Sequence, residues 1–243
     1  VQLLADNHGH VYQLGERDCS IQRRHQKLLE ETPSPALTPD RRKKLLKAAV
    51  KAAQACKLRN VATIEFLWNE DAQEFYFMEM NTRIQVEHPI TEEVTGADLV
   101  QLQIRAAAGE VMKFPDDEFA PRGHAIEVRV NAENPYKNFT PSPGPVQAVH
   151  FPGGPGIRVD SHVYSGYVIP PFYDSMIGKI IARGKTREEA LTRMSRALAE
   201  FKMVGPATTV PVAQALLADA RFLRGEYNTA FLEQFMNDVF WVS

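Results

Sequence analysis

The chain is poor in cysteine, in basic excess and in long apolar runs. Only two of its 243 residues are cysteine, and neither lies in a spacing typical of zinc sites, which argues against a secreted disulfide framework and favours a reducing compartment. The formal net charge is −2, whereas general nucleic-acid binding normally requires a clear basic excess. No apolar run approaches the roughly 20 residues of a membrane helix. We therefore expect a protein that binds neither nucleic acid nor membranes.

The composition is typical of a globular protein rather than a disordered one. Hydrophobic residues make up 44% and charged residues 24% of the chain, which suits one large domain or two smaller ones. No internal repeat or low-complexity tract is present. The first residue is valine, and residues 1–6 (VQLLAD) already have the pattern of a strand. We therefore expect the natural start of the protein to lie upstream.

The first half of the chain predicts two hairpins and a helix. Residues 1–4 and 11–14 flank a glycine turn, and residues 63–68 and 74–81 are rich in β-branched and aromatic side chains around a polar connection. Between the hairpins, a Thr-Pro pair at 38–39 is a cap signal for a helix that runs to about residue 57.

The character of the chain changes after predicted helices at residues 90–94 and 97–108. This change, near residues 110–121, predicts a domain boundary, with one domain at 1–110 and a second at 111–243. The elements expected in the second domain are strands at 124–130, 146–151 and 176–182, a helix after a capping box at 186–189, and short helices at 210–217 and 229–236. The predicted fold class is α+β.

Two acidic residues of the second hairpin indicate a divalent cation. If the turn centres near Ala72, Glu65 and Glu79 lie opposite each other on one face of the paired strands, and Asn81 shares that face. Facing carboxylates repel each other unless a cation compensates them. Oxygen ligands without cysteine or histidine suit Mg²⁺ or Mn²⁺. The alternative is that both acids simply face solvent on a half-exposed sheet.

The next segment, residues 83–89 (RIQVEHP), groups a guanidinium, an amide and a carboxylate. Pro89 restricts the residue before it to extended geometry. If that extension continues backward, Arg83, Gln85 and Glu87 project to one side. Such a set could bind a small oxyanion and remove its proton. A salt-bridged surface loop is the alternative interpretation.

Two further segments have compositions that bear on anion binding. Residues 22–27 (QRRHQK) carry three cations and a histidine, which suits contact with phosphate or bicarbonate, although a solvated loop would have the same composition. Residues 151–156 (FPGGPG) are rich in glycine but lack the lysine and hydroxyl residue of a phosphate loop, so they predict a turn.

Several of these segments, taken together and in this order, resemble the signature segments of biotin carboxylases, members of the ATP-grasp superfamily. The match is carried by residues 16–27 (ERDCSIQRRHQK), 79–89 (EMNTRIQVEHP), 122–129 (RGHAIEVR), 141–144 (PSPG) and 173–179 (YDSMIGK). The resemblance implies the carboxyl-terminal part of an ATP-grasp domain followed by a biotin carboxylase C-terminal domain of antiparallel strands with packed helices.

The resemblance also implies a reaction. Biotin carboxylases use ATP to activate bicarbonate as carboxyphosphate and then transfer carbon dioxide to a ureido nitrogen of biotin on a carrier protein. At the matching positions, Glu65, Glu79 and Asn81 would bind the Mg²⁺ or Mn²⁺ ions that bridge the ATP phosphates. Gln22 and His25 would contact the nucleotide.

The remaining implied roles concern bicarbonate and biotin. Lys27, Arg83, Gln85 and the Val86 backbone would hold bicarbonate. Glu87 would be the general base that deprotonates bicarbonate. Arg129 would stabilise the enolate-like oxygen of biotin that has lost its ureido proton.

The implied partners are a biotin carboxyl carrier protein or domain, carboxyltransferase subunits or domains, and a second copy in a homodimer, in the cytoplasm or the mitochondrial matrix. Family members grip ATP with an amino-terminal domain and a mobile lid that this sequence does not contain. We therefore expect very weak ATP binding and no useful turnover by this polypeptide in isolation. Two alternatives stay open: another ATP-grasp ligase such as carbamoyl-phosphate synthetase, and a non-catalytic assembly or docking module.

Overall fold

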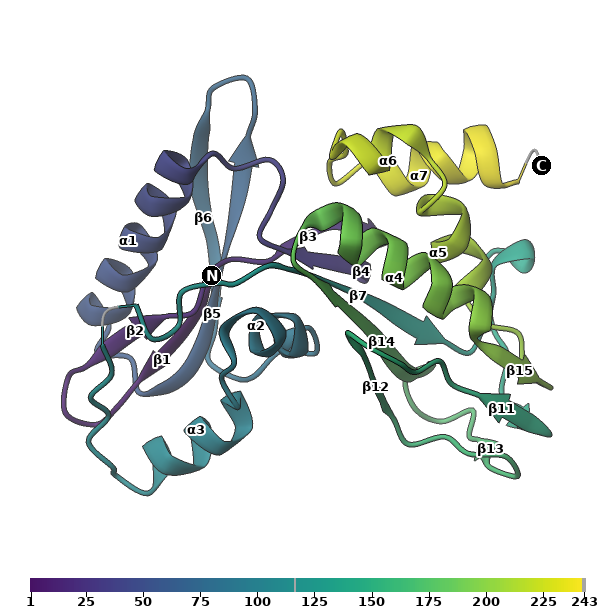
Figure 1. Cartoon of the computed structure of the whole chain (residues 1–243), viewed down its shortest axis with the longest axis horizontal. Coiled ribbons are helices and arrows are strands. Elements are labelled where there is room, and N and C mark those ends of the chain that lie inside the picture. Colours follow the sequence, from purple (N-terminus) through teal and green to yellow (C-terminus); the bar gives the residue numbers. More distant parts are fainter. Residues whose placement is uncertain (116, 242–243) are drawn as a thin grey trace. The chain divides into compact units, whose positions relative to one another are not determined.

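The computed structural model describes residues 1–115 and 117–241. The chain divides into two compact units (Figure 1). The first comprises Val1–Asp18 and Thr32–Arg122, and the second comprises Cys19–Glu31 and Gly123–Ser243. The domain division predicted between residues 110 and 111 stays a prediction. Within the described residues, no helix is both long enough and apolar enough to cross a membrane.

The first unit is built on a four-stranded antiparallel sheet with the strand order β2-β1-β5-β6. Its strands are β1 (Gln2–Ala5), β2 (Val11–Gln13), β5 (Asn60–Asn69) and β6 (Glu74–Asn81), and its helices are α1 (Pro39–Ala55), α2 (His88–Thr95) and α3 (Leu99–Ala107). Both predicted hairpins are present. The predicted start of α1 is also confirmed, because the Thr38 side chain accepts a hydrogen bond from the Arg41 backbone N–H.

Both faces of strand β1 are covered. Strand β1 is buried along its whole length, and its successive residues Leu3 and Leu4 point to opposite faces. Leu3 belongs to a core with the apolar stripe of α1, and Leu4 to a second core with Leu99 and Leu102 of α3. Strand β5 pairs with this buried strand, whereas β6 at the edge of the sheet is largely exposed.

The second unit is built on a five-stranded sheet with the order β12-β14-β7-β4-β3, in which β14 pairs antiparallel with both β12 and β7. Its strands are β3 (Asp18–Arg23), β4 (Gln26–Thr32), β7 (His124–Asn131), β12 (Ile157–Ser161) and β14 (Met176–Gly184). Helix α4 (Arg187–Glu200) packs along β14 and β7 (Figure 1). Its cap is the predicted one, since the Thr186 side chain accepts from the Glu189 N–H.

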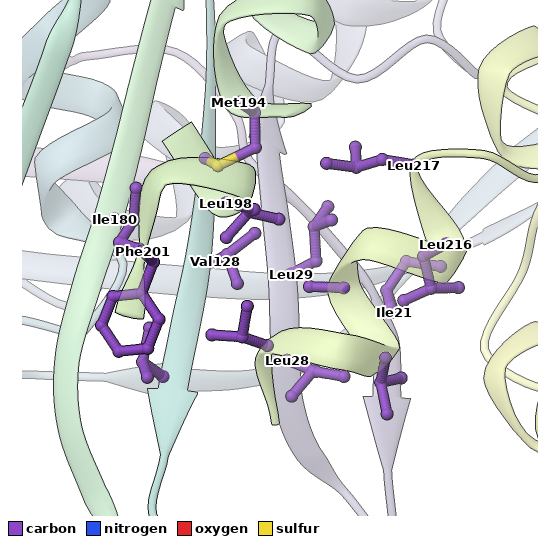
Figure 2. Close-up of a cluster of buried hydrophobic side chains, with 14 of the residues drawn as sticks. Ile21, Leu28, Leu29, Val128, Ile180, Met194, Leu198, Phe201, Leu216 and Leu217 are labelled. Carbon is purple, nitrogen blue, oxygen red and sulfur yellow. The ribbon is translucent and has the colours of Figure 1, made fainter. Parts of the chain in front are cut away.

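Figure 2 shows part of the core of this unit, where Leu29 of β4 and Val128 of β7 lie near Leu198 of α4, and Phe201 lies beside Ile180 of β14. The smaller elements of the unit are β8 (Glu133–Asn134), β9 (Thr140–Pro141), β10 (Gly144–Pro145), β11 (Ala148–His150), β13 (Val168–Ile169), β15 (Lys202–Val204), α5 (Val210–Leu216), α6 (Ala220–Arg224), α7 (Phe231–Phe235), a 3₁₀ turn at Pro135–Lys137 and a π-helical turn at Met236–Phe240. Antiparallel sheets with packed helices in both units confirm the α+β prediction.

One hairpin was not predicted. Strands β3 and β4 join through Arg24 and His25, whose φ angles are 49° and 65°. Such a turn normally contains asparagine or glycine, because other side chains are strained at positive φ. The sequence signal for a hairpin was therefore missing, and residues 22–27 had the composition of a solvated loop. Helix α6 was also not predicted.

Candidate functional site

The acidic pair of the first unit lies as the turn-centred register predicts. Glu65 of β5 is directly opposite Glu79 of β6, and the register shifts immediately afterwards, between Glu65 and Phe66. Irregularities of this kind re-aim side chains locally and often occur beside functional sites. The two carboxylates therefore share one face of the hairpin at a point where its regular pairing breaks.

Two amide side chains connect these carboxylates. The Asn81 Nδ2 atom donates to Glu79 Oε1 at 2.9 Å and, more weakly, to Glu65 Oε1 at 3.3 Å. Gln85 Nε2 donates to the same Glu65 oxygen at 2.7 Å. Arg83 NH2 lies 3.5 Å from Asn81 Oδ1. The structure thus brings together the predicted metal ligands and two of the predicted bicarbonate contacts.

The donor set suits a hard divalent cation. Two facing carboxylates and one amide offer oxygen ligands only, which Mg²⁺ and Mn²⁺ prefer. Asn81 here turns its nitrogen toward the acids, and a half-turn of the amide would offer Oδ1 instead. Across residues 1–115 and 117–241, no group of three or more histidine, cysteine, aspartate or glutamate side chains is placed to hold a metal ion. A metal at this site would therefore rely on the pair of acids, Asn81 and ligands from outside the chain.

The predicted extension of residues 83–88 is wrong at its carboxyl end. Glu87 has φ −81° and ψ 12°, and helix α2 begins at His88, with Pro89 in its first turn. The missing N–H of proline is tolerated in the first turn of a helix, where it has no partner to lose. The His88 N–H closes the turn by donating to the Gln85 carbonyl at 3.2 Å. Arg83, Gln85 and Glu87 are therefore not three residues of one extended segment.

The residues of the 83–89 segment differ in how far they are buried. Gln85 is 5% exposed and Glu87 is 2% exposed, whereas Arg83 lies in solvent. Val86, whose backbone was predicted to contact bicarbonate, lies in the turn and is half-buried. A nearly inaccessible carboxylate at the start of α2 is compatible with the role of a base, but the structure leaves that role a prediction.

Arg17 is a member of this network that the sequence reasoning missed. It precedes β3, and its guanidinium donates to Gln2, Thr91, Thr63 and Gln85 at distances of 2.8–3.2 Å. Its position inside the family-like segment 16–27 was the available signal. The basic run at 22–27, in the same segment, is the more conspicuous feature of the sequence.

The remaining predicted residues belong to the second unit. Gln22 on β3 and Lys27 on β4 are half-buried, and His25 is exposed in the strained turn between these strands. Arg129 lies on β7. Its Nε and NH2 atoms are both 2.6 Å from Glu30 Oε1.

Glu30 holds Arg129 in a defined place. Glu30 is fully buried on β4, and the Arg129 side chain is 15% exposed. Two short charge-assisted contacts to one buried oxygen fix the orientation of a guanidinium. The predicted site residues therefore form two sets. The first unit holds Glu65, Glu79, Asn81, Arg83, Gln85, Val86 and Glu87, and the second holds Gln22, His25, Lys27 and Arg129.

Family models match both parts of the chain. The model described as "Biotin carboxylase C-terminal domain" matches residues 127–234. The model described as "Carbamoyl-phosphate synthase L chain, ATP binding domain" matches residues 1–114. The second description names a protein of the alternative ligase class, but the curated relatives do not favour that alternative.

Curated relatives match the chain over nearly its whole length. Biotin carboxylase 1 of Bacillus subtilis is 55% identical over 235 residues, which is 97% of this chain and 52% of the relative. The biotin carboxylase of a Nostoc species is 55% identical over 96% of this chain and 52% of the relative. A pyruvate carboxylase component of Methanothermobacter thermautotrophicus is 52% identical over 98% of this chain and 48% of the relative. The chain spans about half the length of these curated relatives.

Solved structures that resemble the chain belong to the same kind of protein as the curated relatives. The biotin carboxylase subunit of a pyruvate carboxylase has a TM-score of 0.94 and 44% identity over 97% of this chain and 52% of its own. The biotin carboxylase domain of a thermophilic 2-oxoglutarate carboxylase, solved with bicarbonate, has a TM-score of 0.93 and 45% identity over 96% of this chain and 53% of its own. Motifs, fold and relatives coincide, and the chain belongs to the biotin carboxylase family.

Proposed function

We propose that this chain takes part in the ATP- and bicarbonate-dependent carboxylation of biotin on a carrier protein, with carboxyphosphate as the activated form of bicarbonate. The observation that carries the proposal is the facing pair Glu65 and Glu79 with Gln85 bound to the first of them. The relatives support it, since they include biotin carboxylases and a biotin carboxylase domain solved with MgADP, ADP and bicarbonate.

The first unit would supply the metal and bicarbonate chemistry. Glu65, Glu79 and Asn81 would hold Mg²⁺ or Mn²⁺, which when bound neutralises negative charge on the ATP phosphates. Gln85 would donate an amide N–H to bicarbonate. Glu87 would accept the proton of bicarbonate and so make its oxygen a better nucleophile toward the terminal phosphorus of ATP.

The second unit would supply cationic contacts. Lys27 would contribute a point charge to bicarbonate, and Gln22 and His25 would contact ATP. Arg129 would stabilise the negative oxygen that develops on biotin when its ureido nitrogen loses a proton. The buried Glu30 contact supports this role, because an oriented guanidinium needs little reorganisation when charge appears.

The partners proposed for the intact protein follow from the same chemistry. They are a biotin carboxyl carrier protein or domain, carboxyltransferase subunits or domains of an acetyl-CoA carboxylase or a related enzyme, and a second copy of the protein in a homodimer. Multifunctional pyruvate carboxylase and a dimer of biotin carboxylase domains occur among the similar structures. We place the protein in the cytoplasm or the mitochondrial matrix, since its two cysteines favour a reducing compartment.

The direct test measures ADP release by the protein as its gene encodes it, with and without bicarbonate and free biotin. We expect ADP release that needs bicarbonate and that rises when biotin is added. ADP release that needs bicarbonate but ignores biotin would instead support another ATP-grasp ligase. Failure to cleave ATP while a biotinylated carrier still binds, as measured by sedimentation, would support a docking module.

The Glu87→Gln variant tests the proposed base. Removal of a positioned general base lowers turnover by about 10² to 10⁴, and the amide keeps the size of the side chain. The control is Glu110→Gln, the same chemical change at an exposed ion pair with Arg105, which should leave turnover unchanged. Equal turnover of both variants would remove Glu87 from the mechanism.

A further inference from the structure

Arg17 donates hydrogen bonds to four buried, neutral oxygens of the first unit. NH1 reaches Gln2 Oε1 at 2.8 Å and Thr91 Oγ1 at 3.0 Å, and NH2 reaches Thr63 Oγ1 at 3.2 Å and Gln85 Oε1 at 2.8 Å. The acceptors come from β1, α2, β5 and the segment between β6 and α2. Since the two terminal nitrogens carry four hydrogens, each hydrogen can serve one acceptor.

The contact with Gln85 determines how that amide is turned. A guanidinium can only donate and an ionised carboxylate can only accept. Gln85 lies between Arg17, which donates to its Oε1, and Glu65, which accepts from its Nε2 at 2.7 Å. The reverse orientation would oppose donor to donor at Arg17 and acceptor to acceptor at Glu65. Both ends of the amide are therefore fixed.

This orientation matters for anion binding. The Gln85 nitrogen carries two hydrogens, so one can stay on Glu65 while the other is donated to an oxyanion. A turned amide would present its oxygen to that anion and repel it. Arg17 also brings a positive charge one side chain away from Glu65, and its four acceptors on Gln2, Thr63, Gln85 and Thr91 are all uncharged.

We propose that Arg17 is a positioning residue of the site: it holds Gln85 so that the amide N–H is presented both to Glu65 and to bicarbonate. This inference deepens the proposed function and rests on it. A purely structural role for Arg17, joining β1, β5 and α2, is the competing explanation. The two differ in what they predict for bicarbonate binding.

The Arg17→Lys variant separates the two explanations. Lysine keeps the charge but concentrates three donors on one nitrogen, which cannot reproduce the fork that serves acceptors on separate elements. The protein as its gene encodes it is assayed for the bicarbonate KM, the ATP KM and thermal unfolding. The dissociation constant of ¹³C-bicarbonate is measured by NMR line broadening as a readout that does not depend on turnover.

We expect the bicarbonate KM and dissociation constant to rise about tenfold or more, the size expected for losing a hydrogen bond to a charged group, and the ATP KM to change by less than about twofold. Arg42→Lys is the matched control, since Arg42 is also half-buried in this unit but binds Glu16 and the Ser34 carbonyl. That variant should bind bicarbonate like the wild type.

A double-mutant cycle completes the test. If Arg17 acts through Gln85, then Arg17→Lys adds no further rise in the bicarbonate dissociation constant once Gln85 is alanine. Additive effects of the two changes, or a fall in unfolding temperature with unchanged bicarbonate binding, would overturn the proposal. If Arg17→Lys does not fold, the neutral Arg17→Gln variant is measured in the same way. A wild-type protein that binds bicarbonate but cleaves no ATP would refute the proposed function and leave this inference testable.

Discussion

Asp6 lies at the end of β1 and organises the hairpin turn that follows. Its Oδ1 accepts from the backbone N–H of His8 at 2.8 Å and of His10 at 3.0 Å. Its Oδ2 accepts from His10 Nδ1 at 2.7 Å and from the Met112 N–H at 3.0 Å. The residue is 2% exposed. Burial alone would raise the pKa of this carboxyl, but the bond from Met112 and the bonds from His10 and His8 hold its pKa well below the ordinary value.

The change to test is Asp6→Asn. The amide oxygen can keep the bonds from the backbone N–H groups of His8 and His10. The NH₂ group then faces both partners of Oδ2, the Met112 N–H and His10 Nδ1. The Met112 bond is lost because two donors oppose each other there, and the His10 ring bond is kept only with Nδ1 as acceptor. Loss of a hydrogen bond to a charged group costs about 1.5–3 kcal/mol, and an aspartate with a pKa lowered by hydrogen bonds contributes a similar amount at neutral pH. We expect the free energy of unfolding to fall by about 2–3 kcal/mol at pH 7.

The pH dependence gives the prediction its sign. A carboxyl with a lowered pKa stabilises the folded state fully above its unfolded pKa, about 3.9. That stabilisation is lost as the pH falls from there toward the folded pKa. Urea unfolding is measured for wild type and variant from pH 7 to pH 3. The difference between their free energies of unfolding should be constant down to about pH 5 and should narrow below about pH 4.

The matched control is Asp98→Asn, the same chemical change at an exposed helix cap that binds a single backbone N–H, that of Gln101. Asparagine caps helices as well as aspartate does, so this variant should unfold like the wild type. The reasoning would be refuted if Asp6→Asn and wild type had equal free energies of unfolding at pH 7, or if their difference kept its full size down to pH 3.

Two further predictions concern the second unit. Glu31 is fully buried and accepts bonds from His124, Arg187 and Tyr227. Burial would raise its pKa, but the bonds from His124 and Arg187 hold the pKa below the ordinary value. In urea unfolding at pH 7, Glu31→Gln should lower the free energy of unfolding by about 3–5 kcal/mol and Tyr227→Phe by only about 1 kcal/mol, and the Glu31→Gln loss should shrink below about pH 4. Replacing the strained 24–25 turn by Asn-Gly should raise the unfolding temperature by a few degrees, since these residues suit positive φ. In the protein as its gene encodes it, the same change should weaken ATP binding in a fluorescence titration. An unchanged unfolding temperature would mean that the turn carries no strain.

Some features of the site were accessible from sequence because they depend on local periodicity. The period of two along a strand, together with one turn centre, is enough to place Glu65 opposite Glu79 and Asn81 on the same face. The Thr38 and Thr186 caps were equally local, since each cap bonds only three residues ahead. The motif order predicted the family for the same reason: each motif is a contiguous string.

Other features depended on contacts between distant segments. The expected extension at residues 83–88 was wrong because helix α2 includes Pro89 in its first turn. The packing of this helix, and not the preference of the residue before proline, determines that conformation. The β3–β4 hairpin formed against the strain of its own turn because Ile21 and Leu29 are buried in the core of the second unit. The turn preferences of residues 24 and 25 alone could not predict the hairpin, because they do not include the stabilisation from burying these side chains.

The sequence by itself determined the fold class, the family and the chemical types present at the site, because strand alternation, helix caps and motif strings are properties of neighbouring residues. Only the tertiary structure decided that Arg17 meets Gln85, 68 positions away, and that Arg129 meets Glu30, 99 positions away. A hydrogen bond requires donor and acceptor within about 3 Å of each other, and for residues so far apart in the chain that closeness is set by how the sheets and helices pack.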